Sequence, residues 1–311
     1  MHSGNFRTKA FQLAWAQAQS DMTRKLYKFS GPNEYAIQNL ENGVIYCQHY
    51  SAYNDPFEFW ARIHDGLPDP NKEPDRFMAA KKAWGAQWMG DGDEYLTDYF
   101  ASCIEDQPPF RSWINNTRIA CFGTEPDDLL MWSHYGDGLR GFCIVFDESM
   151  LLKTEGNGFA VNVDYVKEPP KVDAFVWAIV DGLVEYNASE LEEISGKHDG
   201  VSSEGLSESD IQAELKRSIL IQQQMLRALF TTKPIEWEYE HERRLLVQAK
   251  TEDKVPVMDP YPENAIKEII LGELMPNEYR SRILNVLKLC YPDVPVKTAR
   301  RSQERYSLVI D

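Results

Sequence analysis

Acidic residues alternate with aromatic and basic residues in one stretch of the last third of the chain. The stretch Trp237–Arg244 reads WEYEHERR, and Lys233 precedes it. In an extended strand, one face would carry the side chains of Glu238, Glu240, Glu242 and Arg244. Neighbouring groups on that face would lie about 6.5–7 Å apart. Such carboxylates repel one another unless a cation or a substrate lies among them, or Lys233 and Arg244 pair with them. Because an apolar run follows directly, one glutamate is a candidate catalytic residue; the alternative is a solvated edge strand with internal salt bridges.

A second stretch brings aromatic and polar side chains close together. Trp132, His134 and Tyr135 follow a short apolar strand, and a glycine turn then leads into the buried strand 141–146. Each of the three side chains carries a polar group that needs a partner when it is buried. Ordinary packing explains them poorly as a group, so they are candidates for lining a site. For His134 a structural role is the alternative.

A third stretch, Tyr53–Glu58, reads YNDPFE. Proline disfavours the helical conformation in the residue before it, and short polar side chains bond back to the backbone, so this stretch predicts a turn. Asn54 or Asp55 could line a site. The alternative is a helix start, in which Asp55 is the cap and Pro56 takes the first helical position.

These residues need a scaffold, and the apolar pattern predicts one. Expected strands lie at 26–29, 44–47, 119–122, 141–146, 160–166, 243–248, 266–271 and 306–310. Expected helices lie at 34–40, 77–89, 94–104, 127–135, 210–230 and 277–289, the fifth capped by Ser209. The elements intermix without a regular βαβ alternation, which predicts an α+β fold.

The expected domain organisation is simple. Residues 1–25 form an amphipathic helix that packs on its own core or docks a partner or a second copy of the chain. Residues 26–311 form a single α+β domain with insertions at about 64–115 and 181–232. The stretch 187–209 is acidic and rich in serine and glycine, which indicates a mobile surface insertion.

Composition excludes several classes of function. The chain has 311 residues, and its 33 basic and 49 acidic side chains give a net charge of −16. Such a chain is a poor candidate for sequence-independent nucleic-acid binding, which needs lysine and arginine to displace counterions. The five cysteines show no CxxC spacing, so neither a zinc knuckle nor a disulfide framework is expected, and a reducing cytoplasm is the expected location. No stretch approaches the roughly 18–20 apolar residues of a membrane span, and no membrane partner is expected.

Standard motifs for dinucleotide, nucleoside triphosphate, zinc-protease and α/β-hydrolase sites are absent from the sequence, and we expect no metal. The three stretches described above nevertheless resemble a bacterial family of unassigned function, sometimes found beside phage-defence genes. Its motifs LYK[YF], [FY]NDPFE, CF…LMWxHY…xGF, K…WxYExExR and IxxIIxG correspond to Leu26–Phe29, Tyr53–Glu58, Cys121–Phe142, Lys233–Arg244 and Ile266–Gly272.

More distantly, the order of elements is similar to that of the ADP-ribosyltransferase fold, in particular its DNA-modifying toxin branch. The resemblance implies a split sheet of mixed and antiparallel strands with helical insertions, and NAD as a substrate. Lys28 stands where those enzymes carry a histidine or arginine that holds the adenosine side of NAD, and Glu242 stands where they carry the catalytic glutamate. The implied NAD-binding residues are Tyr27, Lys28, Ser30, Asn54, Asp55, Phe122, Trp132, His134, Tyr135 and Arg244.

The chemistry that the resemblance implies is physically reasonable. Cleavage of the N-glycosidic bond of NAD passes through an oxocarbenium-like ribose, and a carboxylate beside the ribose stabilises that cation more in the transition state than in the ground state. Glu242 is the expected catalyst and Glu240 the alternative. Tyr135 or Trp132 could stack on nicotinamide, and Lys28 could neutralise the pyrophosphate.

Three functions therefore stand as hypotheses. The first is an NAD-consuming ADP-ribosyltransferase or glycohydrolase, acting as a toxin or phage-defence effector, with nucleic acid or protein among the possible acceptors. The second is a non-catalytic sensor or interaction module with a transferase-like cleft. The third is a metal-dependent nuclease or hydrolase built from Asp55, Glu240, His241 and Glu242, although no metal-ligand spacing supports it.

Overall fold

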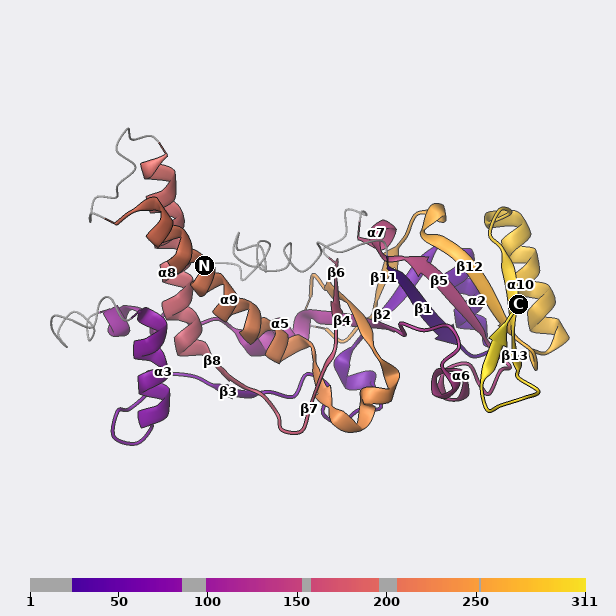
Figure 1. Ribbon diagram of the computed structural model, residues 1–311, viewed down its shortest axis with the longest axis horizontal. Helices are drawn as coiled ribbons and strands as arrows, with labels where there is room; N and C mark the ends of the chain where they lie inside the picture. The colour runs from indigo at the N-terminus through magenta and orange to yellow at the C-terminus, as the bar shows by residue number, and fades with distance from the viewer. Residues whose placement is uncertain (1–23, 86–98, 153–157, 196–205, 252) are drawn as a thin grey trace. The chain divides into compact units, whose positions relative to one another are not determined.

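The computed structural model describes residues 24–85, 99–152, 158–195, 206–251 and 253–311 (Figure 1). They form an α+β structure, as expected, and group into two compact units. The helical unit comprises the described parts of Phe59–Ile114 and Glu168–Thr232, and the sheet unit those of Asp21–Glu58, Asn115–Lys167 and Lys233–Asp311. Both expected insertions fall mainly in the helical unit, while the single-domain organisation stays a prediction. The expected N-terminal helix lies almost entirely outside the described residues.

Two five-stranded sheets contain most of the strands in the described part of the sheet unit. The first has the order β1 (Lys25–Ser30), β5 (Phe142–Asp147), β12 (Ile266–Gly272), β13 (Val296–Arg301) and β14 (Leu308–Ile310). Only β12 and β13 pair in parallel there, so this sheet is mixed. The second is antiparallel, in the order β11 (Val257–Pro260), β2 (Val44–His49), β4 (Thr117–Phe122), β10 (Arg243–Gln248) and β6 (Gly158–Asn162).

A backbone bridge joins the two sheets near the candidate site. Tyr27 of β1 and Gly123, just after β4, exchange backbone hydrogen bonds of 3.1 and 2.9 Å. Gly123 is closely packed there, because a Cβ atom at this position would lie 3.1 Å from the ring of Phe29. The middle of β1 and the end of β4 therefore lie side by side.

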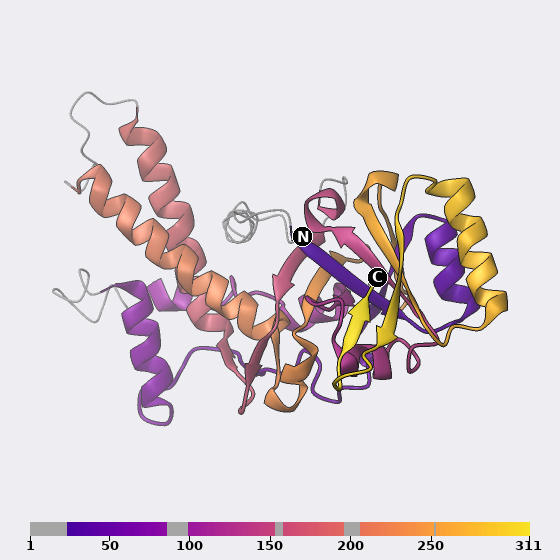
Figure 2. The same cartoon turned by 45° about the vertical axis from the view of Figure 1, so that its right-hand side comes forward.

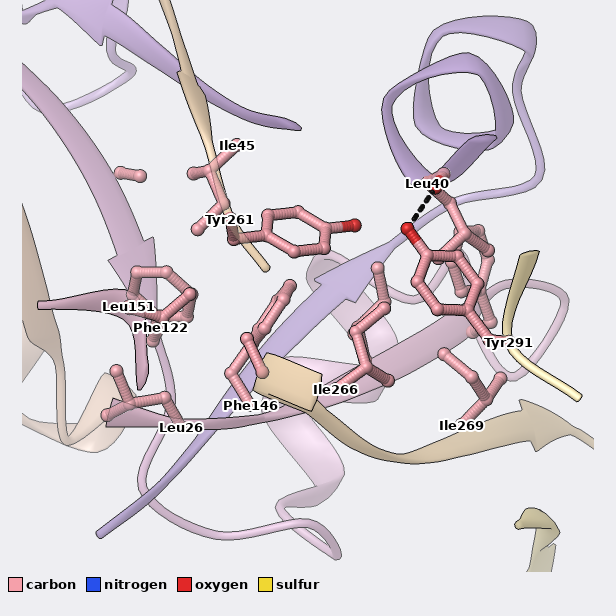
Figure 3. Close-up of a cluster of buried hydrophobic side chains, with 14 of the residues drawn as sticks. Leu26, Leu40, Ile45, Phe122, Phe146, Leu151, Tyr261, Ile266, Ile269 and Tyr291 are labelled. Carbon is pink, nitrogen blue, oxygen red and sulfur yellow. Dashed lines mark hydrogen bonds between the residues drawn. The ribbon is translucent and has the colours of Figure 1, made fainter. Parts of the chain in front are cut away.

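A continuous apolar core joins the strands to two helices, α2 (Glu34–Glu41) and α10 (Asn277–Cys290), which lie side by side in Figures 1 and 2. Figure 3 shows part of this core, with the rings of Phe146 and Tyr261 packed edge to face at 5.0 Å. The hydroxyl of Tyr291 donates a hydrogen bond of 2.9 Å to the carbonyl of Leu40 at the end of α2. Asn33 caps the start of α2 by accepting a hydrogen bond from the amide of Ala36.

Most expected elements of the sheet unit are confirmed, because their apolar runs are the buried strands of this core. One was wrong in form. The expected strand 160–166 is two strands, β6 and β7 (Asp164–Val166), with Val163 between them donating a 3.0 Å hydrogen bond to the carbonyl of Glu242. The remaining short elements of this unit are α6 (Leu129–His134), α7 (Glu148–Leu151), η2 (Tyr50–Ala52), η4 (Ile235–Glu240) and η5 (Glu263–Ala265).

The helical unit is built on α8 (Ala174–Ile194) and α9 (Glu208–Phe230), which pack against each other, and on α3 (Pro74–Trp84). A short parallel pair, β3 (Arg62–His64) with β8 (Lys171–Asp173), precedes α8. At the boundaries of the two units lie α5 (Phe110–Asn116) and β9 (Thr232–Pro234), the latter paired with β7. The expected helices at 77–89 and 94–104 fall partly on residues outside the described ranges.

The prediction of a mobile insertion at 187–209 was wrong for its first described residues, 187–194, which are helical. Helix α8 continues to Ile194, and Val184, Asn187, Glu190 and Ile194 are buried at helical spacing. Two of these four buried positions are polar, so the apolar periodicity did not reveal the helix. The next helix begins at Glu208 with Ser207 as its cap, not Ser209. None of the helices within the described ranges is both long and apolar enough to cross a membrane.

Candidate functional site

A cavity of about 310 Å³ opens in the sheet unit. Its walls come from β1, β2, β4, α6 and the segment from Lys233 to Glu242, close to the point where β1 and β4 meet. Seven of the residues predicted for the site line this one cavity: Tyr27, Lys28, Asn54, Phe122, Tyr135, Glu240 and Glu242. They come from four separate stretches of the sequence, so the fold has gathered them.

The acidic stretch reaches the cavity by a different route from the one expected. Residues Ile235–Glu240 form the 3₁₀ helix η4, and His241 then adopts a left-handed conformation with φ of 41°. Strand β10 begins only at Arg243. The extended row of carboxylates was therefore wrong, because a helical turn after Pro234 replaces the strand. Glu238 is exposed, whereas Glu240 and Glu242 turn inward and are only 3% and 4% exposed.

Lys233 joins the two buried carboxylates. Its ammonium group donates hydrogen bonds to Glu240 Oε2 at 2.5 Å and to Glu242 Oε2 at 3.1 Å. It also lies 4.7 Å from the centre of the Trp237 ring. Burial alone would lower the pKa of Lys233, but Glu242 and Glu240 outweigh it and raise the pKa above its ordinary value. The lysine is therefore charged at neutral pH and holds the two acids side by side.

Glu242 is held as a carboxylate by two cations. Arg244 Nε donates to Glu242 Oε1 at 2.7 Å, and Lys233 approaches the other oxygen. Burial by itself would raise the pKa of Glu242, but the charges of Arg244 and Lys233 overcome it and bring the pKa to about 2. The backbone N–H of Glu242 donates to the hydroxyl of Tyr165 at 2.8 Å, which fixes the chain at this point. An ionised carboxylate therefore lies in the cavity wall.

Tyr135 completes the acidic side of the cavity. Its hydroxyl donates a 2.5 Å hydrogen bond to Glu240 Oε1, and the side chain is 36% exposed. Burial and the neighbouring Glu240 raise the pKa of this phenol above its ordinary value of 10. Tyr135 therefore keeps its proton and acts as a donor toward Glu240.

Basic and aromatic residues also line the cavity. Lys28 Nζ donates to the carbonyl of Cys121 at 2.9 Å and lies 5.4 Å from the centre of the Phe122 ring. Tyr53, also in the wall, donates to the carbonyl of Ile119 at 2.8 Å. The cavity thus presents cations from β1 and β9, the two glutamates and several aromatic rings.

Two predicted residues of α6 lie elsewhere. Trp132 is only 1% exposed and belongs to the core, where its indole N–H donates to the carbonyl of Pro126 at 2.8 Å and its ring meets Phe29 edge to face. His134 is exposed, with its ring centre 6.0 Å from that of Tyr239. Neither side chain lines the cavity, because α6 turns only its Met131 and Tyr135 side toward it.

Three further predicted residues lie outside the cavity wall: Ser30, Asp55 and Arg244. Asp55 accepts a 2.8 Å hydrogen bond from the amide of Phe57 and so closes a turn; no helix begins there, and the helix-start alternative was wrong. Arg244 lies behind Glu242 and supports it without reaching the cavity. The expected pairing of Arg244 with these acids is confirmed, since Arg244 does pair with Glu242.

Sequence reasoning missed several wall residues, including Tyr46, Gln48 and Cys121, and it did not assign Lys233 to the site. Tyr46 and Gln48 alternate on β2, so strand periodicity could have placed both on one face once the strand was known. The buried position of Lys233 carried no local signal. Among the described residues, no group of three or more His, Cys, Asp or Glu side chains could hold a metal ion.

Comparison with known proteins gives one match. A family described as "Protein of unknown function (DUF2971)" matches residues 131–245. This range includes Tyr135, Lys233, Glu240 and Glu242, and the match fits the resemblance to a family of unassigned function. No curated protein matches the chain, and no solved structure does.

Proposed function

We propose that this protein cleaves the N-glycosidic bond of NAD, as a glycohydrolase or as an ADP-ribosyltransferase. The observation that carries the proposal is the ionised carboxylate of Glu242 in the wall of a cavity that also holds Lys28 and several aromatic rings. The two five-stranded sheets and the position of Glu242 just before β10 agree with the split sheet of the ADP-ribosyltransferase fold. That relationship is part of the proposal.

The charged groups of the cavity suit the charged parts of the substrate. NAD carries an anionic pyrophosphate in its middle and a cationic nicotinamide ring at one end. Lys28 would meet the pyrophosphate, and Glu240 and Glu242 would lie beside the nicotinamide ribose. Tyr135 would stack on the nicotinamide ring or donate to the ribose from the rim of the cavity.

Glu242 retains the capacity to contact the ribose. Each carboxylate oxygen can accept about two hydrogen bonds, and Arg244 and Lys233 leave part of this capacity unused. As the glycosidic bond breaks, nicotinamide leaves with the bonding electron pair and the ribose becomes cationic. The carboxylate stabilises this cation. Water or another nucleophile then forms the new bond to the ribose and loses a proton.

Release of nicotinamide from NAD tests the proposal directly. We expect release by the wild-type chain and a fall of about 10²–10³-fold in Glu242→Gln, the loss typical of removing one electrostatic stabiliser of a transition state. Glu238→Gln is the matched control, because Glu238 lies in the same segment but is exposed. Circular dichroism checks that both variants fold. Absence of release by the wild-type chain would overturn the proposal.

Labelled NAD identifies the acceptor in the same assay. Free labelled ADP-ribose indicates water as the acceptor, and label retained on added DNA, RNA or protein indicates transfer. A toxin or defence role is compatible with both forms of this proposal, since consumption of NAD and modification of a macromolecule can each damage a cell.

A second function has one observation in its favour. Both oxygens of Glu242 already accept hydrogen bonds from Arg244 and Lys233, an arrangement that also suits a site that binds a ligand without turnover. This function predicts NAD binding by calorimetry that weakens in Lys28→Met, together with no nicotinamide release.

A further inference from the structure

Glu58, the last residue of the YNDPFE stretch, lies behind the candidate site and has no role in the function proposed so far. It is 5% exposed, and its Oε1 lies 2.7 Å from Arg244 Nη1. Both of its carboxyl oxygens are buried and lack a hydrogen-bond partner among the residues that the structure describes, so the approach to Arg244 is an ion pair without hydrogen-bond geometry. A carboxylate buried this deeply is costly unless it is paired, so its place beside Arg244 calls for an explanation.

Arg244 is shared between two acids. The guanidinium, fully buried, lies 2.7 Å from Glu242 Oε1 on one side and 2.7 Å from Glu58 Oε1 on the other. With Lys233 and Glu240, the connected group contains three carboxylates and two cations. When all are charged, the group carries one excess negative charge. A proton on Glu58 would remove it.

The surroundings of Glu58 favour that proton. Burial is the largest influence on Glu58 and raises its pKa. The cations Arg244 and Lys233 lower the pKa, whereas the nearby acids Glu242 and Asp55 raise it. The result is a pKa above the ordinary value of 4.5. Glu242, by contrast, stays ionised. The two acids that share Arg244 therefore titrate in different ranges of pH.

We propose that Glu58 is a positioning residue that holds Arg244 against Glu242 and, through its protonation state, sets the acid limb of NAD cleavage. This inference rests on the proposed function. When Glu58 is ionised, Arg244 divides its charge between two carboxylates, and Glu242 has more negative charge to offer the developing ribose cation. When Glu58 is protonated, Arg244 neutralises Glu242 more completely, and turnover falls.

The test compares the pH profile of the rate of nicotinamide release (kcat) in the wild type, Glu58→Gln and Glu58→Asp. We expect the wild-type rate to rise with pH along a limb above pH 4.5. Glu58→Gln, fixed in the neutral state, loses this limb and turns over about ten- to a hundredfold more slowly at the wild-type plateau, the loss expected when a supporting residue no longer holds a reacting group. Glu58→Asp restores the limb, because it restores a titrating charge.

Glu148→Gln is the matched control, since Glu148 is a buried acid paired with the neighbouring Arg243. Glu148→Gln should keep the wild-type rise of kcat with pH. A limb that persists in Glu58→Gln, or that also disappears in Glu148→Gln, overturns the inference.

A stability measurement separates this inference from the proposed function. Because the pKa of Glu58 is raised in the folded state, its stabilising contribution is complete below pH 4.5 and is lost as the pH rises through the folded pKa. The difference in melting temperature, Glu58→Gln minus wild type, should therefore increase from pH 4.5 upward. If this increase is found but the wild type releases no nicotinamide, the proton on buried Glu58 is upheld and its catalytic role falls with the proposed function. If the difference stays constant, Glu58 does not change its protonation state in this range, and the inference is overturned.

Discussion

Arg243 and Arg244 are adjacent on β10 and are both buried, but successive side chains of a strand point to opposite faces, and the two arginines meet different partners. Arg243 binds one acid, Glu148 of α7, with Nε at 2.6 Å from Oε2 and Nη2 on the other oxygen. Its Nη1 donates to Asn162 Oδ1 at 2.7 Å, and Nη2 also donates to the carbonyl of Ala160 at 3.2 Å. Arg244 instead lies between Glu242 and Glu58.

The comparison shows how similar residues can have structural or chemical roles. On the Arg243 face, one cation meets one acid, and the amide of Asn162 completes the arrangement. On the Arg244 face, acids outnumber cations, and two of these acids reach a cavity. Excess carboxylate is unfavourable for stability alone, since burying a charge costs free energy unless it is fully paired. It is useful where a cation forms during a reaction.

The largest expected difference between the faces is in stability. Arg244→Met leaves Glu242 and Glu58 buried without their shared cation, and we expect the free energy of unfolding to fall by about 3–5 kcal/mol, with loss of NAD turnover. Arg243→Met leaves a single acid, Glu148, that is slightly more exposed, and we expect a fall of about 1–3 kcal/mol. Urea denaturation measures both, and turnover per folded molecule should remain unchanged in Arg243→Met.

An equal loss of turnover in the two variants would contradict the proposed difference between the Arg243 and Arg244 faces. It would mean that β10 supports the site only as a strand, and that the identity of the acids on each face does not matter. Equal losses of stability with unequal losses of turnover would instead show that the two faces differ in their effect on the reaction alone.

The next effect is a pH dependence with opposite signs for the two acids on Arg244. The pKa of Glu242 is lowered from 4.5 to about 2, so its stabilising contribution is present above pH 4.5 and is lost as the pH falls toward 2. This contribution is on the order of 3 kcal/mol, since each unit of pKa corresponds to about 1.4 kcal/mol. Glu58 has the opposite sign: its stabilising contribution is complete below pH 4.5 and is lost as the pH rises through its raised pKa.

Melting temperatures measured from pH 7 to pH 2 check this pattern. Relative to Glu242→Gln, the wild type should lose stability steadily between pH 4.5 and pH 2. Glu148→Gln, on the Arg243 face, is the reference variant. It should still lose stability between pH 4.5 and pH 2, because Glu242 is unchanged in it. A wild-type profile parallel to that of Glu242→Gln would show that Glu242 is not held ionised.

The sequence predicted β1, β5, β10 and β12 of the sheet unit, because they are short apolar runs bounded by turns, and a buried strand needs little else. It did not predict β11 and β13 of the same unit, nor helix α8. In the second half of α8 the buried face includes Asn187 and Glu190, so the pattern of burial is helical while the pattern of hydrophobicity is not. Local sequence cannot show that a neighbouring helix will cover polar side chains.

The sequence predicted which residues form the site better than it predicted their arrangement. Glu240, Glu242 and Tyr135, singled out by their chemistry, and Lys28, implied by the family resemblance, do gather around one cavity. The 3₁₀ turn of η4 and the left-handed conformation of His241 had no clear local signal, although together they let both glutamates reach Lys233. Glu58 was missed because Arg244, the ionic partner that it has among the described residues, is 186 positions away along the chain.

The smallest expected effect lies at the rim of the cavity. Tyr135→Phe removes the 2.5 Å hydrogen bond to Glu240 Oε1 but leaves the ring in place. Because Tyr135 is partly exposed, water can replace the lost donor, and we expect a change in the free energy of unfolding of about 1 kcal/mol or less. NAD turnover should fall about tenfold, which corresponds to about 1.4 kcal/mol of transition-state stabilisation.

Tyr50→Phe is the matched control for this variant. It also removes one tyrosine hydrogen bond, of 3.1 Å to Asn115 Oδ1, but Tyr50 does not line the cavity. The two variants should lose similar stability, and only Tyr135→Phe should lose turnover, because only its hydroxyl fixes an acid that faces the substrate. If turnover falls equally in both, the excess of acid on the Arg244 face is a feature of packing, as the pair on the Arg243 face is.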